Sequence, residues 1–262
     1  FTFGIGMQLA NGCGSGTLYT VGGGSGRMLI ALLFFVIGSV FGSLSLPAFL
    51  ALGGIDPVLA SDYLGPWGGL AATLASIVIA AALIVAVAKR RGANYRPSRN
   101  YVIGGIAIGL LCIVVFAAGG HPWSVTFGYT VWGAKIFQAL GFDFSHAAFW
   151  QWPGPKHALS ESVLSDTSSL TDFGMLFGAM AAAAAAKPFA AGGWPPAKSL
   201  LAAGIGGLLM GWGARLGFGC NIGAFVGGVA SGSLHGWVWF AAALPGCLIG
   251  SRLRPLFGLS KD

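Results

Sequence analysis

Several runs of this chain are apolar over a length that would cross a lipid bilayer. The clearest is Trp67–Ala88, which holds 22 residues and no charge. A helix of that length rises by about 1.5 Å per residue and so spans a hydrocarbon core of about 30 Å. Only 8% of the 262 residues are charged, against about 25% in soluble domains. The sequence therefore excludes a soluble enzyme and a disordered chain, and it predicts an all-α polytopic membrane protein.

Further crossings and two breaks follow from the same apolar pattern. The uncharged stretch Leu216–Ser251 has 36 residues, and as one straight helix it would extend about 54 Å. It must therefore be broken, and its glycines place the break in its first half. Phe1–Gly26 has the same character, with no charge and nine glycines. The other predicted crossings are Met28–Leu52, bent or ended near Pro47, then Val102–Ala118, Thr171–Phe189, Lys198–Arg215 and Trp237–Ile249.

The positive charges predict an orientation in the membrane. The net charge is +7, and the densest basic segment joins two predicted crossings, as a cytoplasmic loop does under the positive-inside rule. Further basic residues flank the later crossings, so we expect a cytoplasmic C-terminus. This distribution argues against nucleic acid as a partner. The residues concerned are Lys89, Arg90, Arg91, Arg96 and Arg99, then Lys187 and Lys198, then Arg252, Arg254 and Lys261.

The stretch Gly119–Asp172 is more polar than the rest of the chain. We expect it to lie outside the membrane or to re-enter it, on the side opposite to the basic loop. Its carboxylates are expected to face solvent and its tryptophans to lie at the membrane interface. These residues are Glu161, Asp166 and Asp172, and Trp123, Trp132, Trp150 and Trp152.

The chain also contains an internal repeat. Gly4–Leu18 aligned with Gly211–Phe225 gives six identities in 15 positions, including Cys13 with Cys220. We expect a single membrane domain, 1–262, made of two related repeats that are inverted relative to each other, with 1–100 as the remainder of the first repeat and 101–262 as the second. Broken or re-entrant half-helices would meet at a central path, where transporters with such repeats bind substrate. Further matched glycines are Gly38 and Gly42 with Gly246 and Gly250.

The two matched cysteines are the main candidates for a substrate site. We expect each Gly-Cys pair to lie where a half-helix begins, so that backbone N–H groups and the helix dipole favour an anion. A polarisable thiol there suits a substrate with soft sulfur atoms. A buried cysteine can also act only as a small apolar side chain, which is the interpretation for Cys112 and Cys247. The candidate substrate-binding residues are Cys13 and Cys220 with Gly12, Gly14, Gly16, Gly219, Asn221 and Gly223.

Two further residues have two interpretations each. Arg215 lies five residues before Cys220 and would either neutralise a bound anion or extend to the membrane interface. His235 lies in a polar turn and would either bond to backbone or line the pathway. The sequence has no metal-ligand spacing and no nucleotide-binding loop, so no metal, cofactor or ATP coupling is expected within this chain.

Four segments resemble the YeeE/YedE family of bacterial sulfur transport proteins. The resemblance implies an inner-membrane permease that imports thiosulfate along a narrow path, where the thiols of Cys13 and Cys220 hydrogen-bond the anion. It also implies a small cytosolic sulfur-carrier protein as a partner, besides the lipid bilayer. A further cysteine of the family lies in an earlier segment, so we expect an N-terminal portion to precede Phe1. The four segments are Met7–Tyr19, Gly213–Phe225, Ser231–Trp237 and Arg252–Leu259.

Two other functions stay open as alternatives. A membrane sulfurtransferase would carry a persulfide on a cysteine, which needs a positioned base, and no histidine or carboxylate lies within a few residues of either Gly-Cys pair. A passive channel for a small solute would use the half-helices without a preference for anions. A transporter that is not an enzyme is therefore the leading interpretation.

Overall fold

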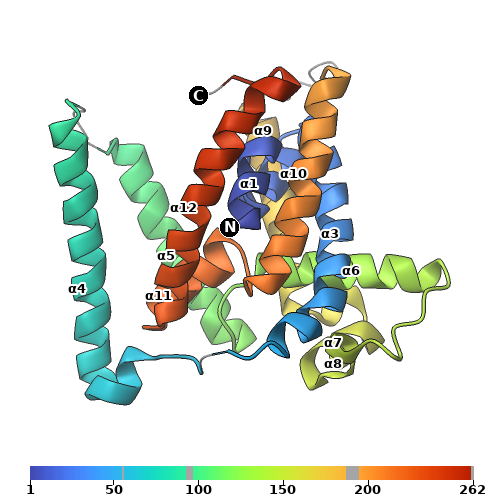
Figure 1. The fold of residues 1–262 in the computed structure, drawn as a ribbon, viewed down its shortest axis with the longest axis horizontal. Helices are drawn as coiled ribbons and strands as arrows, with labels where there is room; N and C mark the ends of the chain where they lie inside the picture. Colours follow the sequence, from blue (N-terminus) through green and yellow to red (C-terminus); the bar gives the residue numbers. More distant parts are fainter. Residues whose placement is uncertain (55, 93–96, 187–194, 261–262) are drawn as a thin grey trace.

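The computed structural model describes residues 1–54, 56–92, 97–186 and 195–260, and over these residues the chain is a bundle of helices without a β-strand (Figure 1). Within this described part, six segments are long and apolar enough to cross a membrane, and each predicted crossing overlaps one of them. The end of Thr171–Phe189 lies outside the described residues. The prediction of an all-α, multi-pass membrane protein is confirmed. The six segments are Gly26–Leu50, Ala60–Arg90, Arg99–Gly119, Thr167–Ala186, Ala197–Ala230 and Leu234–Phe257.

Long helices and short helices both contribute to the bundle. The long ones are α3 (Gly26–Leu50), α4 (Ala60–Arg90), α5 (Arg99–Gly119), α9 (Thr167–Ala186), α10 (Ala197–Leu216) and α12 (Leu234–Leu253). The shorter ones are α1 (Thr2–Ala10), α2 (Gly14–Gly22), α6 (Val125–Ala139), α7 (Ala148–Gln151), α8 (Pro153–Ser160) and α11 (Gly227–Ala230). Single turns are η1 (Val163–Ser165), the π-helix η2 (Asn221–Val226) and η3 (Arg254–Phe257). Helix α3 continues through Pro47 to its end at Leu50.

The core depends on the close approach of α3 to α10, while α1 packs against both α10 and α12. Glycines allow this approach, because a Cβ atom in their place would collide with the opposite backbone. A Cβ at Gly207 would meet the carbonyl of Ala31, and one at Gly211 would meet the carbonyl of Phe35. In a membrane, helices gain little from burying apolar surface against each other, so close backbone packing at small residues stabilises their association.

Equivalent close contacts at a glycine occur between α3 and α10 and between α12 and α1. A Cβ at Gly42 would lie 2.6 Å from Cβ of Arg215, and a Cβ at Gly250 would lie 2.7 Å from Cβ of Gln8. In the aligned sequences Gly42 corresponds to Gly250, and Gln8 corresponds to Arg215. The second contact therefore repeats the first with the halves exchanged. Figure 1 shows that α3 and α12, which carry Gly42 and Gly250, run in opposite directions.

Helices α4 and α5 lie at the edge of the bundle, and α4 stands furthest from the core (Figure 1). Their most apolar stretches bury no residue inside the described part of the protein. Apolar side chains that face outward over the whole length of a helix suit contact with lipid. These two helices therefore account for much of the unusual hydropathy of the chain.

The stretch Gly119–Asp172 contributes to the core, which fits the expectation of a re-entrant segment better than that of one outside the membrane. Helix α6 runs across the vertical helices in Figure 1, and its Tyr129 is fully buried. Trp150 is 1% exposed and donates from Nε1 to Oγ of Ser43 on α3 at 3.1 Å, so its ring packs inside the bundle. Asp172 is fully buried against α6, so the prediction that it faces solvent is wrong. Helix α6 has only 15 residues and is too short to be recognised from sequence as a crossing.

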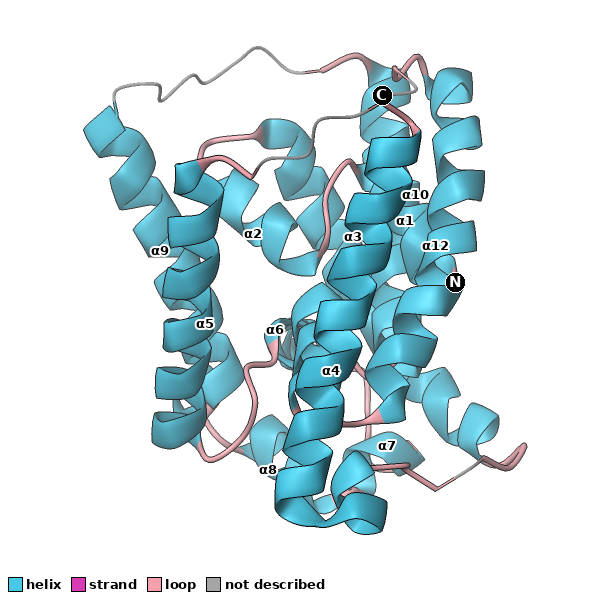
Figure 2. Ribbon diagram, turned by 90° about the vertical axis from the view of Figure 1, so that its left-hand side faces the viewer, coloured by secondary structure: helices cyan, strands magenta, loops and turns pink. Residues whose placement is uncertain are grey.

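Basic residues at the ends of three long helices lie at one end of the bundle (Figure 1, Figure 2). The last turn of α4, the start of α10 and the last turn of α12 lie at one end, together with the C-terminus. These turns carry Lys89 and Arg90, Lys198, and Arg252. The first turn of α4, which carries Asp62, lies at the other end. Of the other basic residues named above, Arg96, Lys187 and Lys261 lie outside the described residues.

The α3–α10 contact predicts the effect of a small substitution. Gly211→Ala should lower the thermal midpoint of the detergent-solubilised protein, because overpacking a tight contact costs about 1–3 kcal/mol. The matched control is Gly104→Ala on α5, where a Cβ would have no atom within 4 Å. Unfolding followed by fluorescence-detected size exclusion would compare the two, and equal midpoints would contradict the role given to Gly211.

Candidate functional site

The first break separates α1 from α2. Asn11 adopts a left-handed backbone conformation with φ 65° and ends α1. Two arginines then supply donors for the last carbonyl groups of this helix. Arg27 donates to the carbonyl of Ala10, and Arg254 donates to the carbonyl of Gln8 at 3.0 Å. These positive groups satisfy carbonyls that have no helical partner and lie at the negative end of the helix dipole.

Cys13 begins the half-helix α2. Its backbone is extended, and its Sγ accepts a hydrogen bond from the N–H of Gly16 at 3.4 Å, so the thiol takes the N-cap position. A serine, threonine or aspartate oxygen usually holds this position, whereas sulfur is a weaker acceptor. Oγ of Ser15 lies 3.5 Å from the same sulfur. The thiol is thus placed at the N–H end of α2, as the sequence predicts.

The second break separates α10 from the π-helix η2. Phe218 and Gly219 both have positive φ, 56° and 148°. A Cβ at Gly219 would also lie 2.6 Å from the backbone nitrogen of Ala224, so glycine is required there for two reasons. Cys220 follows as the N-cap of η2 and lies next to the N–H of Gly223. Single π-helical turns are rare and are frequent at functional sites.

The two breaks meet in the core. A Cβ at Gly14 would lie 3.3 Å from Sγ of Cys220, so the residue after Cys13 contacts the second cysteine directly. Cys220 is fully buried, and Cys13 is partly exposed. Tyr129 of α6 donates from its hydroxyl to the carbonyl of Gly14 at 3.0 Å and holds α2 in this place. The structure therefore brings both Gly-Cys segments together between α2, η2 and α6.

The remaining glycines and the asparagine of the predicted site flank this contact. A Cβ at Gly12 would lie 3.1 Å from Cε of Met28, and one at Gly16 would lie 3.3 Å from the Cys13 sulfur. Gly223 is more open, since the nearest atom to its Cβ position is 3.8 Å away. Oδ1 of Asn221 is buried and has no hydrogen-bond partner among the described residues. The surroundings of Cys220 thus include a polar group that is free to bond a ligand.

Arg215 points into the protein from the last turn of α10. Its side chain is 8% exposed, and its guanidinium lies over the rings of Phe127 and Phe149, 5.7 and 5.6 Å from their centroids. It donates to Oγ1 of Thr130 at 3.4 Å, whereas its Nε has no partner among the described residues. The interpretation that this arginine extends to the membrane interface is therefore wrong. A buried cation without a carboxylate partner remains near the second break.

His235 lies in the first turn of α12. Its backbone N–H donates to Oγ of Ser233 at 3.2 Å, and its ring is 6.3 Å from that of Phe218 in the second break. None of its described contacts reaches Cys13 or Cys220. The structure places this histidine beside the break and does not bring it to the two thiols.

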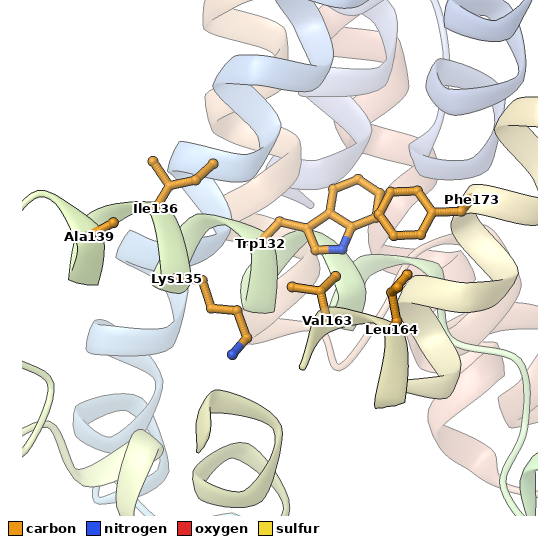
Figure 3. Close-up of a pocket in the computed structure, with 7 residues that line it drawn as sticks. All are labelled: Trp132, Lys135, Ile136, Ala139, Val163, Leu164 and Phe173. Atoms are coloured by element: carbon orange, nitrogen blue, oxygen red, sulfur yellow. The ribbon is translucent and has the colours of Figure 1, made fainter. Parts of the chain in front are cut away.

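Two pockets lie away from the thiols. A pocket of about 440 Å³ between α6 and α9 is shown in Figure 3, where the ring of Trp132 faces that of Phe173, with centroids 5.0 Å apart. Nζ of Lys135 at its edge is already bonded to the carbonyl groups of Leu159 and Glu161. A groove of about 650 Å³ between α5 and η2 contains Cys112. Both are mainly apolar, and neither contains a residue of the predicted thiol pair.

Sequence reasoning missed two residues that hold or flank the site. Tyr129 and Asp172 come from the stretch Gly119–Asp172, which was expected to lie outside the membrane or to re-enter it. Tyr129 bonds to Gly14, and Asp172 lies close enough to both Tyr129 and Cys220 to interact with them electrostatically. Asp172 lies in the predicted crossing Thr171–Phe189, and a carboxylate inside a crossing is itself an indication of a functional residue.

Known proteins with similar sequences are transporters. The profile of the sulphur transport family matches residues 1–249. The probable transporter YedE of Escherichia coli (strain K12) is 35% identical over 154 residues, which cover 58% of this chain and 37% of YedE. YedE of Salmonella typhimurium is 34% identical over the same lengths. The thiosulfate transporter TsuA of Spirochaeta thermophila is 28% identical over 260 residues, covering 91% of this chain and 71% of TsuA.

The extent of these matches differs between the family and its individual members. The match spans little more than a third of the length of the two YedE proteins. The family profile instead includes both Gly-Cys segments and all the predicted site residues. The relatives are named as transporters and not as enzymes. Because the profile covers nearly the whole sequence, this chain belongs to the sulphur transport family.

Proposed function

We propose that the chain carries thiosulfate, or a related sulfur anion, across the membrane between the N-terminal ends of its two half-helices. The observation that supports this most directly is the contact of Gly14 with the Cys220 sulfur. It puts two N-cap thiols and two N–H helix ends beside one another, and such ends favour an anion. The name of TsuA supports thiosulfate among the sulfur anions.

The thiols would serve as transient partners of the anion. Each S–H is a weak donor and each sulfur is a weak, polarisable acceptor. Weak partners suit a path, because an anion that is held too tightly cannot leave. The anion would displace the Gly16 N–H from the Cys13 sulfur and bond to the N–H of Gly223 near Cys220. Asn221 and Arg215 would add polar and positive contacts on the side of the second break.

We infer that the two halves are inverted repeats, with 1–100 belonging to the first and 101–262 to the second. The exchanged contacts of Gly42 with Arg215 and of Gly250 with Gln8 support this relation. So do the opposite directions of α3 and α12 in Figure 1. Inverted repeats place the substrate near the middle of the bilayer and let the two sides open in turn.

We further propose a place in the bacterial inner membrane with the basic end of the bundle in the cytoplasm. The clustering of Lys89, Arg90, Lys198 and Arg252 at the end that carries the C-terminus supports this orientation under the positive-inside rule. A small cytosolic sulfur-carrier protein would then meet the transporter at this basic end and receive the imported anion.

The first prediction concerns the two thiols. Cys13→Ala and Cys220→Ala should each lower the uptake of radiolabelled thiosulfate into proteoliposomes by at least about tenfold, because each removes a substrate contact from a single path. Cys112→Ala and Cys247→Ala are the matched controls and should transport normally. Normal uptake by both of the first variants would reject the proposal. A gain of one sulfur atom on either thiol after turnover, seen by mass spectrometry, would favour the persulfide mechanism instead.

The second prediction concerns Arg215. Arg215→Gln should raise the KM for thiosulfate roughly ten- to a hundredfold, because a hydrogen bond to a charged group contributes about 1.5–3 kcal/mol. Arg215→Lys should restore part of the affinity, since it keeps the charge but loses the planar fork. Arg252→Gln replaces an exposed arginine and serves as the control. An unchanged KM in Arg215→Gln would remove Arg215 from the pathway.

The third prediction concerns orientation. A green fluorescent protein fused after the C-terminus should fluoresce in cells, and an alkaline phosphatase fused at the same place should be inactive. The reason is that the first reporter folds in the cytoplasm, where the basic end would face, whereas the second needs the oxidising periplasm for its disulfides. The reverse pattern would place the basic end outside.

A further inference from the structure

Asp172 is a fully buried carboxylic acid within the membrane-length helix α9. Neither of its carboxyl oxygens has a hydrogen-bond partner among the described residues. An ionised carboxylate is costly in such surroundings unless it is paired, whereas the neutral acid is tolerated. Ionisable groups inside a membrane are rare and mark ion pathways and proton relays.

The carboxyl group of Asp172 is held against α6, next to the meeting point of the two breaks. A Cβ at Gly128 would lie 2.5 Å from Oδ2 of Asp172, so the carboxyl group packs directly against this glycine. The next residue, Tyr129, donates to the carbonyl of Gly14, and Gly14 contacts the Cys220 sulfur. A continuous series of contacts therefore joins Asp172 to the thiol pair.

The surroundings of Asp172 offer no compensating charge among the described residues. Asp166, which precedes α9, is itself acidic, and its Oδ2 accepts from the N–H of Ser169. Helix α2, which also packs on α9, contains no charged residue. Lys135 of α6 bonds to carbonyl groups near α8. The titratable groups that face Asp172 are Asp166, Tyr129 and Cys220.

We propose that Asp172 binds a proton from one side of the membrane and releases it to the other, so that sulfur-anion import is coupled to proton import. This rests on the proposed function. With the acid protonated, the site beside Cys220 carries no negative charge and admits the anion, and loss of the proton helps to expel it. No bond of the anion is made or broken, and the carboxyl group returns to its protonated state by taking the next proton from the outside. Each proton that is carried inward also offsets one negative charge of the anion. This lowers the energy needed to move the anion against the membrane potential.

The test uses the protein in liposomes that contain a pH-sensitive dye. Addition of thiosulfate outside should acidify the lumen, and an inward pH gradient should drive accumulation of radiolabelled thiosulfate above the outside concentration. Thiosulfate entry that leaves the lumen pH unchanged, or accumulation that requires a sodium gradient in place of the pH gradient, would overturn the proposal. If the liposomes do not exchange labelled for unlabelled thiosulfate, the protein does not transport thiosulfate at all. That result would reject the proposed function as well as the proton coupling.

The variant Asp172→Asn assigns the coupling to this residue, because the amide has the shape of the neutral acid but cannot release a proton. It should lose gradient-driven accumulation and dye acidification by at least about tenfold, while exchange at equal pH stays within about twofold of the original protein. Glu161→Gln, which neutralises an exposed carboxylate, should leave both unchanged. Retained accumulation in Asp172→Asn would overturn the proposal, and so would loss of exchange together with accumulation, which would indicate a structural role.

Discussion

Broken helices inside a membrane must satisfy their backbone polar groups within the protein, because lipid offers no hydrogen bonds. The two breaks meet this requirement at their carbonyl ends in different ways. At the first break, Arg27 and Arg254 donate to the last carbonyls of α1. At the second, the N–H groups of Gly217 and Gly219 turn back and donate to the end of α10. The carbonyl ends are therefore closed by the chain itself, and the start of α2 lies beside Cys220 at the start of η2.

This arrangement is only stable if the helices around the breaks pack very closely. A short helix such as α1 or α2 cannot hold itself in place, so its position depends on α3, α10 and α12. The glycines at the α3–α10 contact bring the two backbones together, which places the start of α2 beside the start of η2. The glycines of α3 and α10 therefore contribute to the packing that holds the two breaks together.

The sequence was sufficient for the crossings, for both breaks and for the two cysteines at helix starts, because hydropathy and glycine content are local properties. It was not sufficient for α6, Trp150 or Asp172. Whether a short helix such as α6 lies across the core depends on the space between the other helices, and a local sequence pattern does not indicate that space. Arg215 illustrates the same limit: both interpretations were compatible with its spacing from Cys220, and only packing against Phe127 and Phe149 distinguishes them.

Helix α6 has a consequence for the charges of the site. On one side its Phe127 and Thr130 contact Arg215, and on the other its Gly128 contacts Asp172. The helix therefore stands between a buried cation and a buried acid that would otherwise attract each other. A salt bridge between them would satisfy both groups and leave neither for a ligand. By keeping them apart, α6 leaves Arg215 available for the proposed contact with an anion and Asp172 available for the proposed exchange of a proton.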